Sequence, residues 1–217
     1  MKNNFFSLTT LEVGLPQLIS NVYIFEYGKK VNLIDAWYGD TSPIIASIRN
    51  NYPRLDNIFL THWHFDHIDG LTKLLEAFPY ATCYINKEEA RFLEDSSLSM
   101  SRHFRLFENY RKNFRTFKNG DMIDGILAIG TPWHSIWSTC YHVEEYSTCF
   151  TGDTLFSDNH WRTDLPTGDY DAIRASIGKL LTLDPNTVIY PWHWEWWVKL
   201  SDVRDSDSET LKLIFSA

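Results

Sequence analysis

A chain of 217 residues is long enough to bury a sizeable core, and its 44% hydrophobic and 22% charged residues are ordinary for a globular protein. The formal net charge of −8 argues against a nucleic-acid partner, because phosphate binding needs a basic surface. The amino-terminal residues lack the apolar core of a signal peptide, no apolar run could span a bilayer, and Cys83, Cys140 and Cys149 are widely scattered. We therefore expect a cytoplasmic protein with no membrane partner and no disulfide framework.

The first part of the chain alternates strand-like and helix-like segments. Short runs rich in β-forming residues predict strands, and apolar residues at spacings of three and four predict helices. The predicted elements are a hairpin of strands 21–27 and 31–35, a helix over 43–50, a strand over 57–61, a helix over 68–78, a strand over 81–85 and a helix over 87–93.

Residues 94–119 are predicted to form a helical insertion. Phe104, Phe107, Tyr110, Phe114 and Phe117 follow a helical spacing over residues 102–117, and Gly120 is well placed to end the helix. The opposite face is basic and carries Arg105, Arg111, Lys112 and Arg115. This segment is interpreted as a helix packed on the core, or as a lid over a site or a contact of a homodimer.

Strands are predicted again over residues 122–129, 147–151 and 187–190, with a helix over 170–183. The charged tail from residue 203 ends in an amphipathic helix containing Leu211, Leu213 and Ile214. Strands group early and again late, with helices between them. This order predicts a layered α/β sandwich with mixed sheets, whose loops meet at one edge.

The most informative motif is Thr61-His62-Trp63-His64-Phe65-Asp66-His67, which directly follows a predicted strand. Imidazole nitrogen and carboxylate oxygen are ligands that suit zinc, iron or manganese. Histidines separated by one residue can converge on one ion, and the following Asp-His pair can hold a second. Helix capping is the alternative role for a lone histidine, but four ligand-type side chains in six positions favour a metal site.

Other ligand candidates also follow predicted strands. They are His134, Asp153 and His193, which share the cluster's position at the carboxyl end of a strand. The remaining histidines, His103, His142 and His160, lie in a helix, a strand and a loop, where structural or exposed roles are expected.

The ordered set His62-x-His64-x-Asp66-His67, His134, Asp153 and His193 resembles the metallo-β-lactamase superfamily. The resemblance implies a single domain over residues 1–217 with a four-layer αββα sandwich of two mixed β-sheets. It further implies that His62, His64 and His134 bind one ion, that Asp66, His67 and His193 bind another, and that Asp153 bridges them. Asp35 matches the family's early aspartate, which orients a ligand. Two divalent ions are therefore expected, zinc first, with iron or manganese as alternatives.

The blocks Gly152-Asp153-Thr154-Leu155-Phe156 and Arg162-Thr163-Asp164 are similar to glyoxalase II-like thioester hydrolases. Arg162 and Asp164 are expected either to hold the loop of Asp153 or to contact substrate. Trp133 and Trp192 replace the usual glycines of two ligand loops, and Trp194, Trp196 and Trp197 follow. These indoles are interpreted as core packing or as walls of an apolar pocket. Few residues follow His193, so the helical domain that binds glutathione in glyoxalase II is expected to be absent.

The resemblance implies a metallo-hydrolase in which hydroxide bridging two ions cleaves a thioester, lactone or other small ester, with Asp66 accepting and returning a proton. A small molecule is thus the expected substrate. Two alternatives stay open. One is a persulfide dioxygenase with a single iron, and the other is a binding protein that keeps the fold without turnover.

Overall fold

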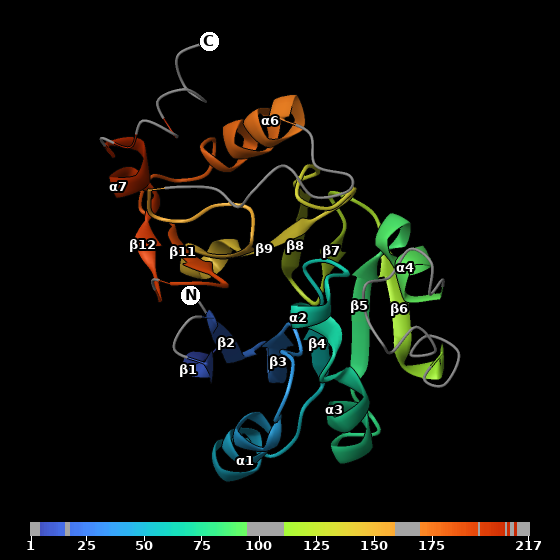
Figure 1. Ribbon diagram of the computed structural model, residues 1–217. Helices are drawn as coiled ribbons and strands as arrows, with labels where there is room; N and C mark the ends of the chain where they lie inside the picture. The colour runs from blue at the N-terminus through green and yellow to red at the C-terminus, as the bar shows by residue number, and fades with distance from the viewer. Residues whose placement is uncertain are drawn as a thin grey trace. The chain divides into compact units, whose positions relative to one another are not determined.

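The computed structural model describes residues 5–15, 18–94, 111–158, 170–194, 196–206, 208 and 211. The chain divides into two units, residues 1–118 and 119–217, and each contains one six-stranded mixed sheet (Figure 1). The predicted α/β class with two mixed sheets is confirmed. The expectation of a single domain over 1–217 stays a prediction. Among the described residues, no helix is both long and apolar enough to cross a membrane.

The sheet of the first unit has the order β1-β2-β3-β4-β5-β6. Its antiparallel strands are β1 (Phe6–Leu15), β2 (Leu18–Tyr27) and β3 (Lys30–Ile34), and the parallel ones that follow are β4 (Asn57–Phe59), β5 (Thr82–Asn86) and β6 (Phe114–Phe117). The helices are α1 (Ser42–Asn51), α2 (Phe65–Ile68), α3 (Leu71–Ala77) and α4 (Lys87–Glu94), with a 3-10 turn at Arg111–Asn113. The sequence pattern missed β1, but the predicted hairpin of β2 and β3 is confirmed.

A row of buried side chains crosses the parallel strands of this sheet. Leu33, Ile58, Cys83 and Phe114 lie opposite one another in register, and all are buried. Apolar residues in such short strands form a core because both faces of a parallel sheet are usually covered. Figure 1 shows α1 and α3 on the same side of this sheet. The row fixes the register of β3 and β4, and therefore which residues follow their carboxyl ends.

The helix predicted over residues 102–117 is wrong at its end, where Phe114–Phe117 forms strand β6, parallel to β5. Phe114 and Phe117 are both buried although they are three residues apart. A spacing of three does not distinguish a helix from a strand that is buried on both faces. Residues 102–110, with the remaining residues of the predicted apolar stripe, lie outside the described residues.

The helix predicted over residues 68–78 is confirmed for Leu71–Ala77, which forms α3, but Gly70 separates it from Ile68, the last residue of the short helix α2. The Gly70 N–H donates to Trp37 O at 2.7 Å. A Cβ atom at this position would lie 2.1 Å from Ala36 O and 2.5 Å from Thr41 Cγ2. Glycine is therefore needed here because the loop after β3 passes directly against the helix pair.

We expect Gly70→Ala to lower the free energy of unfolding by about 3 kcal/mol, because the added methyl must displace backbone atoms. Urea unfolding followed by circular dichroism measures this change. Gly178→Ala is the matched control. Gly178 lies inside helix α6 of the second unit, its Cβ would meet nothing within 4 Å, and alanine should stabilise the protein by about 0.5–1 kcal/mol. Equal unfolding midpoints for the two variants would contradict the expected close contact.

The second unit has the sheet order β12-β11-β10-β9-β8-β7. Its strands are β7 (Met122–Ile123), β8 (Ile126–Gly130), β9 (Thr139–Val143), β10 (Thr148–Gly152), β11 (Val188–Pro191) and β12 (Val198–Lys199), and only β10 and β11 pair in parallel. A 3-10 turn (Glu144–Tyr146) precedes β10, and the helices are α6 (Tyr170–Leu180) and α7 (Leu200–Arg204). The predicted strand over 122–129 is a hairpin, because Asp124 and Gly125 both adopt left-handed conformations that turn the chain.

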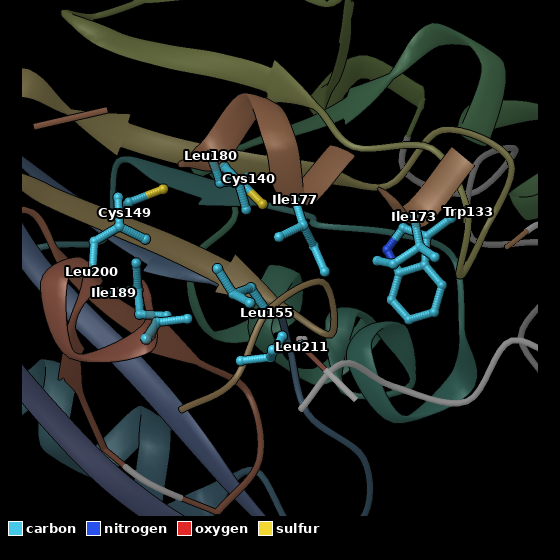
Figure 2. Close-up of a cluster of buried hydrophobic side chains, with 11 residues drawn as sticks. Trp133, Cys140, Cys149, Leu155, Ile173, Ile177, Leu180, Ile189, Leu200 and Leu211 are labelled. Carbon is cyan, nitrogen blue, oxygen red and sulfur yellow. The ribbon is translucent and has the colours of Figure 1, made fainter. Parts of the chain in front are cut away.

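Helix α6 packs its apolar face on this sheet (Figure 2). Ile173, Ile177 and Leu180 contact a cluster that includes Cys140 of β9 and Cys149 of β10. Neither these cysteines nor Cys83 forms a disulfide, as expected. Leu211 is buried in the same cluster, whereas Leu213 and Ile214 of the predicted terminal helix lie outside the described residues. The core thus ties α6 to the strands whose ends carry ligand-type residues.

Candidate metal centre

The His/Asp motif occupies the turn between β4 and α2, as the sequence predicts. Strand β4 ends at Phe59, and His64 caps the short helix α2, which contains Asp66 and His67. His62, His64 and His67 are buried, whereas Asp66 is partly exposed. Such burial is unusual for imidazoles, and it places their nitrogens where a positive ion would be partly shielded from water.

His62 and His64 direct ring nitrogens at each other. His62 Nε2 lies 2.9 Å from His64 Nδ1. A hydrogen bond would give this separation, and two ligands of one tetrahedral ion, each bonded at 2.0–2.1 Å, would lie about 3.3 Å apart. The pair therefore needs only a small adjustment to hold a single ion, as predicted for histidines separated by one residue.

Asp35 directly follows β3, and its carboxylate accepts three hydrogen bonds from residues of the His/Asp motif. Its Oδ1 accepts from the Thr61 N–H at 2.7 Å, and its Oδ2 accepts from Thr61 Oγ1 at 2.7 Å and from His67 Nδ1 at 2.8 Å. Because the Thr61 hydroxyl proton points to Asp35, its oxygen is left to accept from His62 Nδ1, 3.0 Å away. This network puts the protons on Nδ1 of His62 and His67 and leaves both Nε2 atoms as lone-pair donors.

The network explains how Asp35 can be completely buried. Burial raises the pKa of the Asp35 carboxyl, while His67 and Thr61 act in the opposite direction. Asp35 also adopts a left-handed backbone conformation with φ of 54°, and Trp37 follows with φ of 60°. Left-handed non-glycine residues are uncommon and concentrate at functional sites. The expected orienting role of Asp35 thus has a structural basis.

Residue Glu89 of α4 supports the same loop and was not recognised from the sequence. Its Oε2 accepts from the Trp63 N–H at 3.2 Å, between the two histidines, and its side chain is buried. The Trp63 indole stacks on Phe92 of α4 with ring centroids 4.8 Å apart. In the sequence, a buried glutamate in a charged helix looks the same as an exposed one, so no pattern pointed to Glu89.

The second unit places His134, Asp153 and His193 together. They follow β8, β10 and β11 respectively, and all three are buried. His134 Nε2 lies 3.5 Å from Asp153 Oδ2, and His193 Nε2 lies 3.9 Å from Asp153 Oδ1. One carboxylate thus presents a different oxygen to each imidazole, which is the arrangement expected of a bridging ligand.

A shared scaffold holds these ligand loops. Thr131 Oγ1 lies 3.0 Å from Thr154 Oγ1, which links the loop of His134 to the residue after Asp153. Helix α6 braces the first loop, since Ser176 Oγ donates to Pro132 O at 3.0 Å and Lys179 Nζ donates to Gly130 O at 3.1 Å. The loops are therefore held before any ligand binds.

The tryptophans that replace glycines divide into two groups. Trp133 and Trp192 are buried, and Trp133 belongs to the hydrophobic cluster beneath α6 (Figure 2), so the core-packing interpretation is confirmed for Trp133. Trp194, Trp196 and Trp197 are about half exposed. The Trp194 ring meets Phe156 edge-on with centroids 4.8 Å apart. The two tryptophans that replace the loop glycines are therefore buried, whereas the three that follow His193 are partly open to solvent.

Four of the remaining residues singled out in the sequence lie outside the described part of the chain. They are His103, His160, Arg162 and Asp164. His142 lies in β9, as predicted, and burial lowers the pKa of its imidazole. Its position within a strand agrees with the expected structural role.

The donor set fits divalent metal ions. Five buried imidazoles and two carboxylates follow strand ends in the two units, and hydrogen bonds at Nδ1 of His62 and His67 make Nε2 the lone-pair nitrogen of each ring. Nitrogen and oxygen donors with second partners of this kind are typical of zinc, iron and manganese sites.

Comparison with known proteins gives a consistent result. Residues 15–193 match the family model described as the metallo-beta-lactamase superfamily. A probable metallo-hydrolase of Streptococcus pyogenes is 30% identical over 182 residues, covering 80% of this chain and 78% of its own length. A hydroxyacylglutathione hydrolase of Tolumonas auensis is 27% identical over 176 residues, which cover 79% of this chain and 60% of that protein.

Solved structures agree with these matches. TTHA1623, crystallised in a di-iron-bound form, is 26% identical with a TM-score of 0.74, covering 92% of this chain and 98% of its own. ETHE1 from Myxococcus xanthus has a TM-score of 0.73 at 20% identity, covering 94% of this chain and 85% of its own, which shows likeness of fold alone.

Proposed function

Because the chain belongs to the metallo-β-lactamase superfamily, we propose that it is a metal-dependent hydrolase that cleaves a thioester, lactone or other small ester. The observation that carries the proposal is the Asp35–Thr61–His67 network, which sets the tautomers of His62 and His67. A protein that kept only the fold would have no need of a buried carboxylate to prepare these imidazoles as ligands. The network therefore favours an enzyme over a binding protein.

The proposed ligand assignment follows the family pattern. His62, His64 and His134 would hold one ion, and Asp66, His67 and His193 the other, with the Asp153 carboxylate shared between them. Within the first unit this is supported by the facing nitrogens of His62 and His64. Within the second it is supported by the two different Asp153 oxygens near His134 and His193. Zinc is the first choice, and iron is supported by the di-iron form of the similar TTHA1623.

When bound, divalent ions would supply Lewis acidity and would lower the pKa of a bound water to about 7. The chain's own residues would then position and move protons. Asp66 is partly exposed, and its Oδ2 lies 3.7 Å from His67 Nε2, so it can accept the proton of an attacking water and return it to the leaving group. Asp35 would keep the His67 ring in place throughout.

The proposed substrate is a small molecule rather than a polymer. The acidic chain disfavours nucleic acid, and a similar protein carries the name hydroxyacylglutathione hydrolase. That name supports an ester-type or thioester bond as the target. This chain spans only 60% of that relative, so the glutathione part of its substrate is not carried over.

Metal analysis and a panel of small substrates test the proposal together. We expect the purified protein to contain about two divalent ions per chain and to release acid from at least one thioester, lactone or ester. A phosphoester panel is the control, since the proposal expects no turnover of it. One iron per chain with oxygen uptake and no acid release would instead indicate a dioxygenase, and would overturn the proposed hydrolase.

A further inference from the structure

The first unit contains a cavity of about 490 Å³ next to the loop that follows Asp35. This volume lies in the range of small-molecule binding pockets. The end of β1 and the loop leading into α1 form its walls. The lining residues are Glu12, Val13, Gly14, Trp37, Tyr38, Gly39, Asp40 and Pro43. Val13, Trp37 and Pro43 make the wall mainly apolar, while Glu12 and Asp40 contribute carboxylates.

Tyr38 lines this cavity and also contacts the His/Asp motif. Its ring packs on Trp37 with centroids 4.2 Å apart and meets Phe65 edge-on at 5.6 Å. Phe65 begins helix α2 and directly precedes Asp66, so the Tyr38 ring contacts the His/Asp motif. The loop is also fixed to the motif, because the Ala36 N–H donates to His67 O at 2.7 Å. A ligand in the cavity would thus lie against a loop that contacts the motif at Phe65 and His67.

Resting on the function proposed above, we propose that this cavity binds a neutral, apolar acyl group of the substrate. The apolar wall gains free energy by removing hydrocarbon from water. The carboxylates at Glu12 and Asp40 disfavour a substrate arm that ends in a negative charge. Glu12 is exposed on the rim, so its carboxylate can be replaced by an amide without disturbing the core.

The test uses the full-length, metal-loaded protein and a series of unbranched primary amides with four, six and eight carbons. Each methylene buried in the cavity should strengthen binding about fourfold, as measured by calorimetry. The same increments should appear in kcat/KM for the matching acyl esters. A six-carbon amide that ends in a carboxylate should bind several-fold more weakly, and Glu12→Gln should reduce that penalty.

Pro43→Trp is the key variant, because Pro43 is exposed at the start of α1 and a large ring there intrudes into the cavity. It should remove the dependence of affinity on chain length. Asn50→Trp, exposed near the other end of α1, is the matched control and should retain the dependence.

The outcomes separate the two proposals. Affinity that does not rise with chain length, or that rises equally in Pro43→Trp, overturns the acyl pocket even if esters are hydrolysed. Amides that bind with the expected increments while no ester is cleaved support the pocket and overturn the hydrolase.

Discussion

Asp153→Ala is expected to lose most of its bound metal and to hydrolyse substrate about a thousandfold more slowly or worse, a loss of roughly 4 kcal/mol of transition-state stabilisation. The Asp153 carboxylate faces His134 with one oxygen and His193 with the other, at 3.5 and 3.9 Å. Removing it takes away the group common to both imidazoles. Inductively coupled plasma analysis of metal content and steady-state kinetics measure the two effects.

The control for Asp153→Ala is Asp158→Ala, five residues further along the chain, where the side chain is exposed. It should keep both metal content and turnover. Circular dichroism should show the strands of both variants intact, since the scaffold of Thr131, Thr154 and α6 does not depend on Asp153. Full turnover by metal-free Asp153→Ala protein would rule out the proposed hydrolase.

Asp35→Asn is expected to weaken metal binding about 10- to 100-fold and to lower the free energy of unfolding by about 3 kcal/mol. The carboxylate accepts from Thr61 N, Thr61 Oγ1 and His67 Nδ1 in a fully buried position. The asparagine side chain has an NH2 group in place of one carboxylate oxygen. This group cannot accept a hydrogen bond from Thr61 or His67, so at least one buried hydrogen bond is lost. The His67 ring would then lose the partner that fixes its tautomer.

Metal affinity is measured by competition with a chromophoric chelator, and stability by urea unfolding of the metal-free protein. Glu76→Gln is the matched control, because Glu76 is an exposed carboxylate in the same unit and its amide should change neither quantity. If Asp35→Asn bound metal as tightly as the wild type, Asp35 would have no orienting role.

Much of the metal centre could be predicted from the sequence because its signals are local. The motif from His62 to His67 follows a short apolar strand, and His134, Asp153 and His193 each follow another. Strand ends are recognisable from runs of β-forming residues, and ligand residues there are few. The assignment of ligands to particular ions came from the family resemblance and stays a proposal.

Errors arose where one local pattern suits two structures. The spacing of Phe114 and Phe117 fits a helix, yet both residues lie in strand β6, where pairing with β5 satisfies their backbone groups. The apolar residues between 68 and 78 fit one helix, yet α3 begins only at Leu71, because the loop after β3 packs directly against Gly70. In both places a partner distant in sequence decided the outcome.

By itself, the sequence indicated the mixed α/β class and the ligand-type residues of the candidate metal centre, because ligand type and strand position can be recognised from adjacent residues. The proposed chemistry came from the family resemblance. Only the tertiary structure decided that Asp35 and Thr61 set the histidine tautomers, that Glu89 holds Trp63, that Trp133 belongs to the core, and that an apolar cavity lies beside Tyr38. These features depend on contacts between residues far apart in the chain, and the spacing of residues along the sequence does not predict such contacts.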